Sequence, residues 1–466
     1  MDIHELPSTN ITMECPFTWQ LDLKKVCDFC EEDKTLADYT EAPISCYIQM
    51  VTFAYIRSMQ GKIVAAEELI EKINATWDNI YENVSEQKVY SIDVLMHIKD
   101  ATAYYIYSMI GKKDKAKEME SKIKDANDFK SDIEKGTIVG CQALATKLLD
   151  EKKKNPDISL KLAKLASSYV PNCALWHYVI AECLRMKRRF HNFSANISEE
   201  ERNEYLKCYK LSESDHSYMC VARLYRESNN WEKCSEMYNS LYLKEPTSLT
   251  TRLSLVLFFL SSKDFVKAKD CLDYVEKILP PEKSNKTYYH YLAKYYEKTK
   301  NYPKAKENYL KAIGETNNFP ADMDYLILIR NTSNSKYDYE VIKHLKSMLN
   351  KYKDNKSLIV HIMLTLAITY LFKNKNLKLA ADYFLKAIQT NPHDPQLENF
   401  QTRFRDVNRY NIFELISSKI LTEDEHNYGN TLQELKNHCI QYKNRKENNV
   451  SDLLSLSVAE TLSLNE

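Results

Sequence analysis

The stretch YMCVARLYRESNNWEKCSEMYNSLYLKEP at 218–246 determines the fold, because its pattern of apolar residues returns 34 residues later. The second copy is RLSLVLFFLSSKDFVKAKDCLDYVEKILP at 252–280, in which Ala268 takes the place of Cys234. A third copy carries the same offsets at Tyr289, Leu292, Ala293, Tyr296, Ala305, Tyr309 and Ala312. The regular return of one pattern indicates a chain built from repeated units.

Each repeat is explained by a pair of helices. Large residues three and four positions apart form an apolar stripe on the first helix, and the small residue on the second helix lets the two backbones approach closely. Such a period is typical of tetratricopeptide repeats, and a content of only six glycines argues against a sheet protein with many tight turns. The sequence therefore predicts an all-α fold, a right-handed tetratricopeptide-repeat superhelix (α-solenoid) of about nine helix pairs. We expect Ala222, Tyr225, Tyr238 and Ala268 to lie in the core between helices.

The repeats divide the chain into six predicted segments. These are an N-terminal lead-in at 1–43, N-terminal tetratricopeptide repeats at 44–190, an irregular connection at 191–214, C-terminal tetratricopeptide repeats at 215–392, capping helices at 393–446 and a disordered tail at 447–466. For the tail, a short docking helix is the alternative. The helices expected in the first repeats are Ser45–Gln60, Val64–Asn74, Asp93–Ile110, Lys113–Lys124, Ile133–Lys152, Ser159–Tyr169 and Ala174–Arg189.

Two irregularities interrupt the period. Polar residues at 192–203 break it, which is why an irregular connection is predicted there. The last repeat, which ends at Pro392, has a turn one residue longer than the pattern. We expect the helices that follow it to cover the open end of the stack.

The composition favours a cytoplasmic chain without a membrane partner. Sixty-five basic and 65 acidic side chains give a net charge of zero, so no global field demands nucleic acid. The first residues lack the basic segment and apolar run of a signal peptide. The apolar run at 253–260 is too short to span a membrane and is interpreted as a repeat helix. Twelve scattered cysteines fit a reducing compartment, where they serve as small buried apolar residues.

The sequence offers no site for catalysis, a cofactor or a metal. It contains no phosphate-binding glycine loop, no HExxH and no nucleophile elbow, so we expect a protein that is not an enzyme and needs no cofactor. Cys27 and Cys30 form the only CxxC, and without a second ligand pair they are interpreted as ordinary helix residues. His290 lies among tyrosines on a repeat helix and is interpreted as a core or groove residue.

Two basic clusters are candidates for nucleic-acid contact. The densest is RMKRRF at 185–190, which contains Arg185, Lys187, Arg188 and Arg189. Cations beside an aromatic ring are suited to binding single-stranded nucleic acid, because the cations contact phosphates while the ring stacks on a base. The alternative interpretation is the C-terminal end of a helix, where the cations complement the helix dipole and stay solvated. For the second cluster, Arg403, Arg405, Arg409 and Tyr410, a solvated helix face is the favoured interpretation.

The lead-in ECPFTWQL at 14–21 resembles the opening E-C-x-F-T-W-x-L of the interferon-induced proteins with tetratricopeptide repeats. Further stretches resemble family motifs in the same order, namely FAYIRSMQG at 53–61, EKG at 134–136, ARLYR at 222–226 and PTS at 246–248. The resemblance covers about 14–320 and implies the same helical-repeat fold. It also implies a role in antiviral defence, because family members either bind the 5′ end of foreign single-stranded RNA in a basic tunnel or serve as protein scaffolds.

Only part of the family's RNA site has a counterpart in this sequence. The tryptophan that stacks on the RNA cap corresponds to Thr137, and the lysine four residues later corresponds to Cys141. Two basic positions are kept, one at Arg185 within one residue and one at Arg226. The resemblance therefore implies that cap recognition is lost, while Arg185 and Arg226 remain candidates for contact with RNA phosphates.

Three functions follow from these observations. The first is a non-enzymatic scaffold of the innate immune and antiviral response, with a protein or peptide in its concave groove. The second is a single-stranded RNA-binding protein with a basic channel, formed by Arg185, Lys187, Arg188, Arg189 and Arg226. The third is a general protein–protein adaptor unrelated to immunity. A contiguous basic lining favours RNA, whereas an acidic or mixed lining favours a protein partner.

Overall fold

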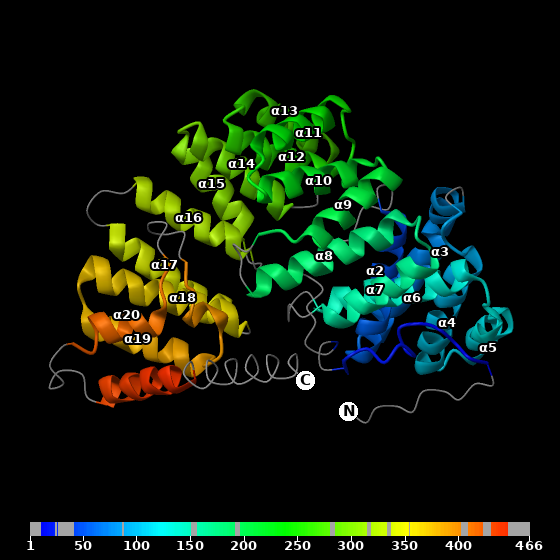
Figure 1. Cartoon of the computed structure of the whole chain (residues 1–466), viewed down its shortest axis with the longest axis horizontal. Coiled ribbons are helices and arrows are strands. Elements are labelled where there is room, and N and C mark those ends of the chain that lie inside the picture. Colours follow the sequence, from blue (N-terminus) through cyan, green and yellow to red (C-terminus); the bar gives the residue numbers. More distant parts are fainter. Residues whose placement is uncertain are drawn as a thin grey trace, which may run out of the picture. The chain divides into compact units, whose positions relative to one another are not determined.

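The computed structural model describes residues 11–23, 26, 42–85, 88–150, 156–191, 196–279, 285–314, 318–332, 337–353, 355–401, 409–422 and 430–445. The chain forms two compact units, unit 1 at Met1–Val275 and unit 2 at Glu276–Glu466. In the described ranges, helices and turns make up the secondary structure, apart from one isolated antiparallel bridge between Phe400 and Tyr410 (Figure 1). The predicted all-α class, with helices stacked in pairs, is confirmed.

Unit 1 consists of consecutive helices that pack side by side in pairs. Its helices are α2 (Pro43–Met59), α3 (Ile63–Ser85), α4 (Ile92–Ile110), α5 (Lys113–Lys122), α6 (Asp132–Asp150), α7 (Asp157–Tyr169), α8 (Ala174–His191), α9 (Glu199–Leu211), α10 (Asp215–Glu227), α11 (Trp231–Leu243), α12 (Leu249–Ser262) and all but the last three residues of α13 (Phe265–Ile278). A short 3-10 turn, η2 (Ala126–Asp128), precedes α6. Helix α4 ends at Gly111, whose φ of 80° is the left-handed conformation that favours glycine.

The predicted irregular connection at 191–214 is wrong over most of its length, because it contains helix α9. The hydroxyl of Ser198 accepts a hydrogen bond from the Glu201 backbone N–H and so caps the helix. Three glutamates in the first turn complement the helix dipole. On its inner face α9 buries Tyr205 and Cys208. The described part of the polar stretch, from 196 onward, therefore contains a capped helix start, and α8 has a helix partner.

The lead-in motif at 14–21 has a structural role in unit 1. The ring of Phe17 stacks on Tyr105 of α4 at 5.0 Å and meets Tyr55 of α2 edge to face at 4.9 Å. The indole N–H of Trp19 donates to the Glu14 carboxylate at 2.8 Å, and so does the side-chain amide of Gln142 in α6 at 3.1 Å. The motif thus joins the lead-in to the first helices of the unit.

Four repeats place a lysine over the aromatic ring of the preceding helix. In each of these repeats the second helix carries a small residue, such as Ala305, and the lysine is the residue directly before it. The aromatic residue belongs to the first helix and lies nine positions before the small residue. The distances from ammonium to ring centroid are 5.1 Å for Lys115 and Tyr107, 5.5 Å for Lys233 and Tyr225, 5.3 Å for Lys267 and Phe259, and 5.3 Å for Lys304 and Tyr296. These cation–π contacts join the two helices of a repeat at their connecting turn.

The predicted core residues are confirmed with one exception. The side chains of Ala222, Tyr238 and Ala268 are buried between helices. Tyr225 is only half-buried, so its placement in the core was wrong. Tyr225 lies in the last turn of α10, where its ring contacts the ammonium of Lys233 at 5.5 Å.

The contact between Lys304 and Tyr296 gives a first prediction. Replacing Lys304 with methionine keeps the length of the side chain and removes the charge over the ring. We expect the free energy of unfolding of unit 2 to fall by about 0.5–1 kcal/mol, measured by urea denaturation. Lys306→Met on the same helix is the matched control, because Lys306 is also exposed and stacks on no ring among the described residues. Equal effects of the two substitutions would contradict the prediction.

Unit 2 continues the paired arrangement. Its helices are α14 (Lys286–Lys298), α15 (Tyr302–Ile313), α16 (Phe319–Thr332), α17 (Tyr337–Lys351), α18 (Lys356–Thr369), α19 (Leu377–Thr390) and α20 (Ile412–Lys419), followed by a helix at 430–445. A π-helical turn, η3 (Tyr370–Asn374), extends α18 and accommodates the extra residue expected in this repeat. The stretch Lys356–Asn374 is long and apolar enough to cross a membrane, but most of it is buried in the core of unit 2.

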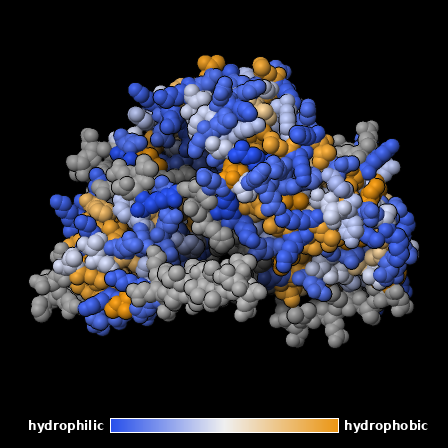
Figure 2. All heavy atoms as spheres, viewed as in Figure 1, coloured by the Kyte–Doolittle hydropathy of each residue, from blue (hydrophilic) through white to orange (hydrophobic). Residues whose placement is uncertain are grey.

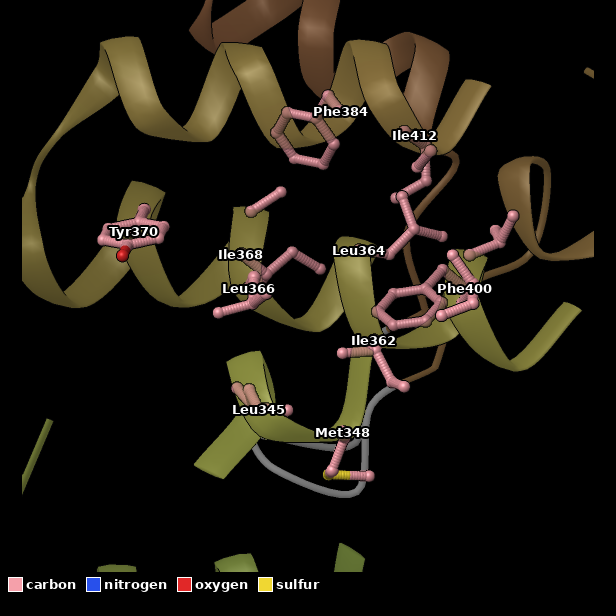
Figure 3. Close-up of a cluster of buried hydrophobic side chains, with 14 of the residues drawn as sticks. Leu345, Met348, Ile362, Leu364, Leu366, Ile368, Tyr370, Phe384, Phe400 and Ile412 are labelled. Carbon is pink, nitrogen blue, oxygen red and sulfur yellow. The ribbon is translucent and has the colours of Figure 1, made fainter. Parts of the chain in front are cut away.

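The two terminal helices of unit 2 belong to the same core as its repeats. Figure 3 shows part of this core, in which Leu364 of α18 lies near Phe400 and Ile412. The rings of Phe413 in α20 and Tyr442 in the last helix stack at 4.3 Å. Helices are therefore present in the segment predicted to cap the stack, and they bury apolar surface of the last repeat. The tail at 447–466 lies outside the described residues.

Candidate functional site

The candidate site is a pocket of about 530 Å³ in unit 1. Its walls come from the start of α2, the end of α6, the turn and first residues of α8, and the segment that joins α9 to α10. The main lining residues are Pro43, Ile44, Ser45, Ile48, Gln49, Tyr90, Leu144, Lys147, Leu148, Asn172, Leu175, Tyr178, Leu211 and His216. The volume is that of a typical ligand pocket, and the lining mixes aliphatic and hydrogen-bonding side chains.

One wall of the pocket combines a lysine with a neutral phenol. The ammonium of Lys147 lies 5.9 Å from the ring centroid of Tyr178. The ring of His216 meets Tyr178 edge to face at 4.7 Å. Burial raises the pKa of Tyr178 well above its ordinary value, so its phenol stays protonated at neutral pH. Among the described lining residues, Lys147 is the one with a fixed charge, and none carries a carboxylate.

Three of the predicted RNA-binding arginines converge on a glutamate beside this pocket. Arg185 donates to Glu227 from Nε at 3.0 Å and from Nη2 at 2.6 Å. Arg188 donates to Glu227 at 2.7 Å and forms two further hydrogen bonds with Glu201, at 2.8 and 2.9 Å. Nη1 of Arg189 lies 3.5 Å from the Glu227 carboxylate. Two carboxylates, Glu201 of α9 and Glu227 of α10, therefore offset most of the positive charge of these three arginines.

These arginines and glutamates form a charged cluster, and a second ion pair extends the cluster toward the pocket. Arg223 of α10 donates to the Glu182 carboxylate of α8, which also accepts a hydrogen bond of 2.6 Å from the hydroxyl of Tyr205. Burial alone would raise the pKa of Glu182, but the charges of Arg223, Lys147 and Arg185 outweigh it and hold the pKa at about 2. The carboxylate is thus ionised throughout the physiological range, as is that of Glu227, whose pKa is also about 2.

The other two predicted RNA-binding residues do not join the cluster. Lys187 forms a surface ion pair of 2.8 Å with Asp157 of α7. Arg226 is half-buried and makes no ion pair or side-chain hydrogen bond within the part of the chain that the structure describes. The assignment of all five residues to RNA stays a prediction. What the structure adds is that Arg185, Arg188 and Arg189 have carboxylate partners.

The two positions that correspond to the family's cap site are fully enclosed. Thr137 has no exposed surface, and its hydroxyl donates to the Ile133 carbonyl while it accepts from the Ser91 backbone N–H. Cys141 is also buried, which raises the pKa of its thiol well above the ordinary value. Neither side chain offers a ring or a cation, so both serve the packing of α6.

The remaining candidates from the sequence have structural partners or lie outside the described residues. His290 is buried in unit 2, where Nε2 lies 2.8 Å from the Asp324 carboxylate, which Lys294 also contacts at 2.7 Å. Arg403, Arg405, Cys27 and Cys30 fall outside the described ranges, and Tyr410 forms the isolated bridge with Phe400. In the described ranges, no group of three or more His, Cys, Asp or Glu side chains is placed to hold a metal ion.

His177, near the cluster, is held in its charged form by two acceptors. Its Nε2 lies 2.8 Å from the Pro171 carbonyl and its Nδ1 lies 2.5 Å from the Glu204 carboxylate. Since neither partner can donate, both ring nitrogens must carry hydrogen. Burial lowers the pKa of His177, but the hydrogen bonds with Glu204 and Pro171 outweigh it, so the pKa is raised above 6.5.

This arrangement predicts that unit 1 loses stability as the pH rises. A raised histidine pKa contributes stability that is fully present below the unfolded pKa of 6.5 and is lost as the pH rises through the folded value. We expect the free energy of unfolding to fall as the pH rises above about 6.5, measured by urea denaturation. The His177→Gln variant should show a flatter profile. A wild-type profile parallel to that of the variant would contradict the prediction.

Comparison with known proteins gives a structural likeness without a sequence match. No protein-family model matches the chain, and no curated protein matches it by sequence. Among solved structures, the human IFIT1 dimer with m7Gppp-AAAA is similar with a TM-score of 0.60 and 13% identity, over 92% of this chain and 98% of that chain. The human IFIT1 dimer with PPP-AAAA is similar with a TM-score of 0.58 and 12% identity, over 93% and 97%. At these identities the likeness shows the fold, which is the one that the lead-in motif implied.

Proposed function

We propose that the chain is a non-enzymatic tetratricopeptide-repeat scaffold that binds a polypeptide through unit 1 and acts in the cytoplasm in antiviral defence. The observation that carries the proposal is the convergence of Arg185, Arg188 and Arg189 on Glu227. A phosphate chain could use these arginines only after their ion pairs open, which leaves buried carboxylates such as Glu201 without a partner. The cluster of arginines and glutamates is therefore mixed in charge, as expected for a surface that binds protein.

The surface of unit 1 supports the same proposal. Figure 2 shows hydrophobic side chains at the surface among hydrophilic ones, and Ile158 and Leu165 of α7 are both exposed. The pocket adds an aliphatic lining from α2, α6 and α8. Exposed apolar side chains within a polar surrounding are typical of protein interfaces, whereas nucleic-acid sites are dominated by unpaired cations.

A role in antiviral defence rests on the lead-in motif together with the fold shared with human IFIT1. The test is a comparison of virus yield in cells that express the wild-type chain or the Lys147→Glu variant, which places a carboxylate in the pocket. We expect the wild-type chain to lower the yield and the variant to lose this effect at equal protein level. Equal virus yield with and without the wild-type chain would overturn the antiviral part of the proposal and leave a general adaptor.

The second candidate function is binding of the 5′ end of single-stranded RNA. It is favoured by the solved structures of human IFIT1, which contain m7Gppp-AAAA or PPP-AAAA, and by Arg226, which has no carboxylate partner among the described residues. If RNA binds, phosphate contact must dominate because Thr137 offers no ring for stacking. Affinity would then fall steeply with salt and would not depend on a cap.

Titration with RNA separates the two functions. The wild-type chain and an Arg185→Glu/Arg226→Glu variant are titrated with the same short RNA bearing a 5′-triphosphate, a cap or a 5′-hydroxyl, at two salt concentrations. The scaffold proposal predicts no saturable, end-dependent binding by either protein. Binding by the wild-type chain that the double variant weakens by about 1–3 kcal/mol for each lost contact would replace the scaffold with the RNA function.

A further inference from the structure

Unit 2 carries two pairs of lysines at one edge of its helix stack. Consecutive helices from α14 to α19 pack on one another and are joined by short connections, so neighbouring helices run antiparallel. Helices α14, α16 and α18 therefore all end at the same edge. Lys298 and Lys300 lie where α14 turns into α15, and Lys375 and Lys378 lie where α18 turns into α19. These four residues are named the lysine edge.

The charges of the lysine edge are not used inside the described part of the chain. All four side chains are exposed, and within the described ranges they make no ion pair or side-chain hydrogen bond. The turn from α4 to α5 in unit 1 differs in this respect, because Lys112 and Lys115 both contact the carboxylate of Glu67. The lysine edge is thus available to an anionic partner.

Two of these lysines also occupy a backbone conformation that favours glycine. The φ angle is 63° at Lys300 and 49° at Lys375, in the left-handed region. Two turns of unit 1 have glycine at the matching position, Gly61 with a φ of 76° and Gly111 with a φ of 80°. A lysine is less favourable there than glycine, which indicates that its side chain serves a contact outside the chain.

A carboxylate at the same edge decides between kinds of anionic partner. Glu340 lies in the first turn of α17, between the two lysine pairs in the order of the stack, and its side chain is exposed. A uniform polyanion, such as RNA or an acidic lipid surface, would bring negative charge against Glu340. A polypeptide can instead place acidic runs at the lysines and neutral residues between the runs. Tyr302 exposes its ring at this edge and is suited to contact with a polypeptide.

We infer that the lysine edge of unit 2 binds an acidic polypeptide, with one run of carboxylates at each lysine pair and uncharged residues opposite Glu340. Each contact between exposed charges is weak, so the affinity comes from engaging both pairs at once. The inference goes beyond the function proposed for unit 1 and does not depend on it, because every residue that carries it belongs to unit 2.

The test measures the binding of fluorescein-labelled peptides to the full chain by fluorescence anisotropy. One peptide has two glutamate runs joined by a glycine–serine spacer, which is made in several lengths. Its controls are a single run, an uninterrupted run with the same number of glutamates, and a glutamine version. We expect the two-run peptide with the best spacer to bind at least about tenfold more tightly than the single run, and to weaken as salt is added. The uninterrupted run should bind less tightly than the two-run peptide.

Variants assign the binding to the lysine edge. Replacing both lysines of either pair with glutamine should reduce the two-run peptide to the affinity of the single run. Lys353→Gln/Lys356→Gln is the matched control, because these exposed lysines lie at the opposite edge, where α17 connects to α18. Glu340→Gln should remove the preference for the interrupted peptide. Lys300→Gly/Lys375→Gly should weaken binding while it raises the temperature of thermal unfolding, which separates loss of contact from loss of fold.

Several results would overturn the inference. These are equal binding of the glutamate and glutamine peptides, no binding of any peptide, and a loss in the matched control as large as that at the lysine edge. Tighter binding of the uninterrupted run, of unstructured single-stranded RNA or of phosphatidylserine vesicles would replace the polypeptide with a uniform polyanion. The function proposed for unit 1 is decided separately, by virus yield and by the titration of the Arg185→Glu/Arg226→Glu variant.

Discussion

Replacing Arg188 with methionine is expected to lower the free energy of unfolding of unit 1 by about 3–5 kcal/mol. The guanidinium bridges Glu201 of α9 and Glu227 of α10, and the side chain of Glu201 is only 1% exposed. Removing the cation leaves two carboxylates facing each other, one of them buried without a counter-charge. Such an unpaired buried charge costs several times more than the intact ion pair contributes.

Two controls make this prediction specific, both measured by urea denaturation followed by circular dichroism. Lys187→Met, one residue away, should change the stability by less than about 1 kcal/mol, because its ion pair with Asp157 is nearly half exposed. Adding Glu201→Gln to Arg188→Met should recover part of the loss, since the buried charge is then gone. A loss below about 1 kcal/mol would show that Arg188 is not needed for the fold and would strengthen its assignment to RNA.

The cluster of arginines and glutamates also predicts that unit 1 of the wild-type chain loses stability in acid. The pKa of Glu227 is about 2, against an ordinary value of 4.5, because Arg185 and Arg188 outweigh the effect of burial. A depressed carboxyl pKa contributes stability that is present above the unfolded pKa and is lost as the pH falls through the folded value. The stability of the wild-type unit should therefore decline below about pH 4.5, measured by urea denaturation.

The helix pairs could be predicted from the sequence because their cause is local. An apolar stripe on one helix and a small residue on the next define each pair, so the helix expected at Asp93–Ile110 is found as α4 at Ile92–Ile110. Helix α9 was missed because its first turn is polar, and polarity at a capped helix start has the same appearance in sequence as a loop. Ser198 followed by three glutamates was the available signal.

The charge balance of the site could not be predicted in the same way. The basic run at 185–190 is contiguous in sequence, but the carboxylates that neutralise it come from α9 and α10, up to 42 residues away. Which side chains converge depends on how three helices pack, and apolar periodicity does not report that. The pocket was missed for the same reason, because Lys147 and Tyr178 are ordinary residues until α6 and α8 bring them together.

Replacing Trp176 with alanine is expected to destabilise unit 1 by about 3–5 kcal/mol, because the residue has no exposed surface and its loss leaves a large cavity. Its indole N–H has no hydrogen-bond partner among the described residues, so Trp176→Phe removes no polar contact and should cost much less. The ring packs edge to face on Tyr90 at 5.7 Å. Urea denaturation of the two variants gives the comparison, and similar losses for alanine and phenylalanine would contradict the prediction.

The partner of Trp176 on α6 is Gly140, and it supplies a second test of the same packing. A Cβ atom at Gly140 would lie 2.3 Å from the indole ring, so Gly140→Ala should cost about 1–3 kcal/mol although alanine favours a helix. The Gly140→Ala/Trp176→Phe double variant should recover part of that loss, since the smaller ring leaves room for the methyl group. Leu175 and Tyr178 on either side of Trp176 line the pocket, so this contact also fixes the wall that α8 presents to a ligand.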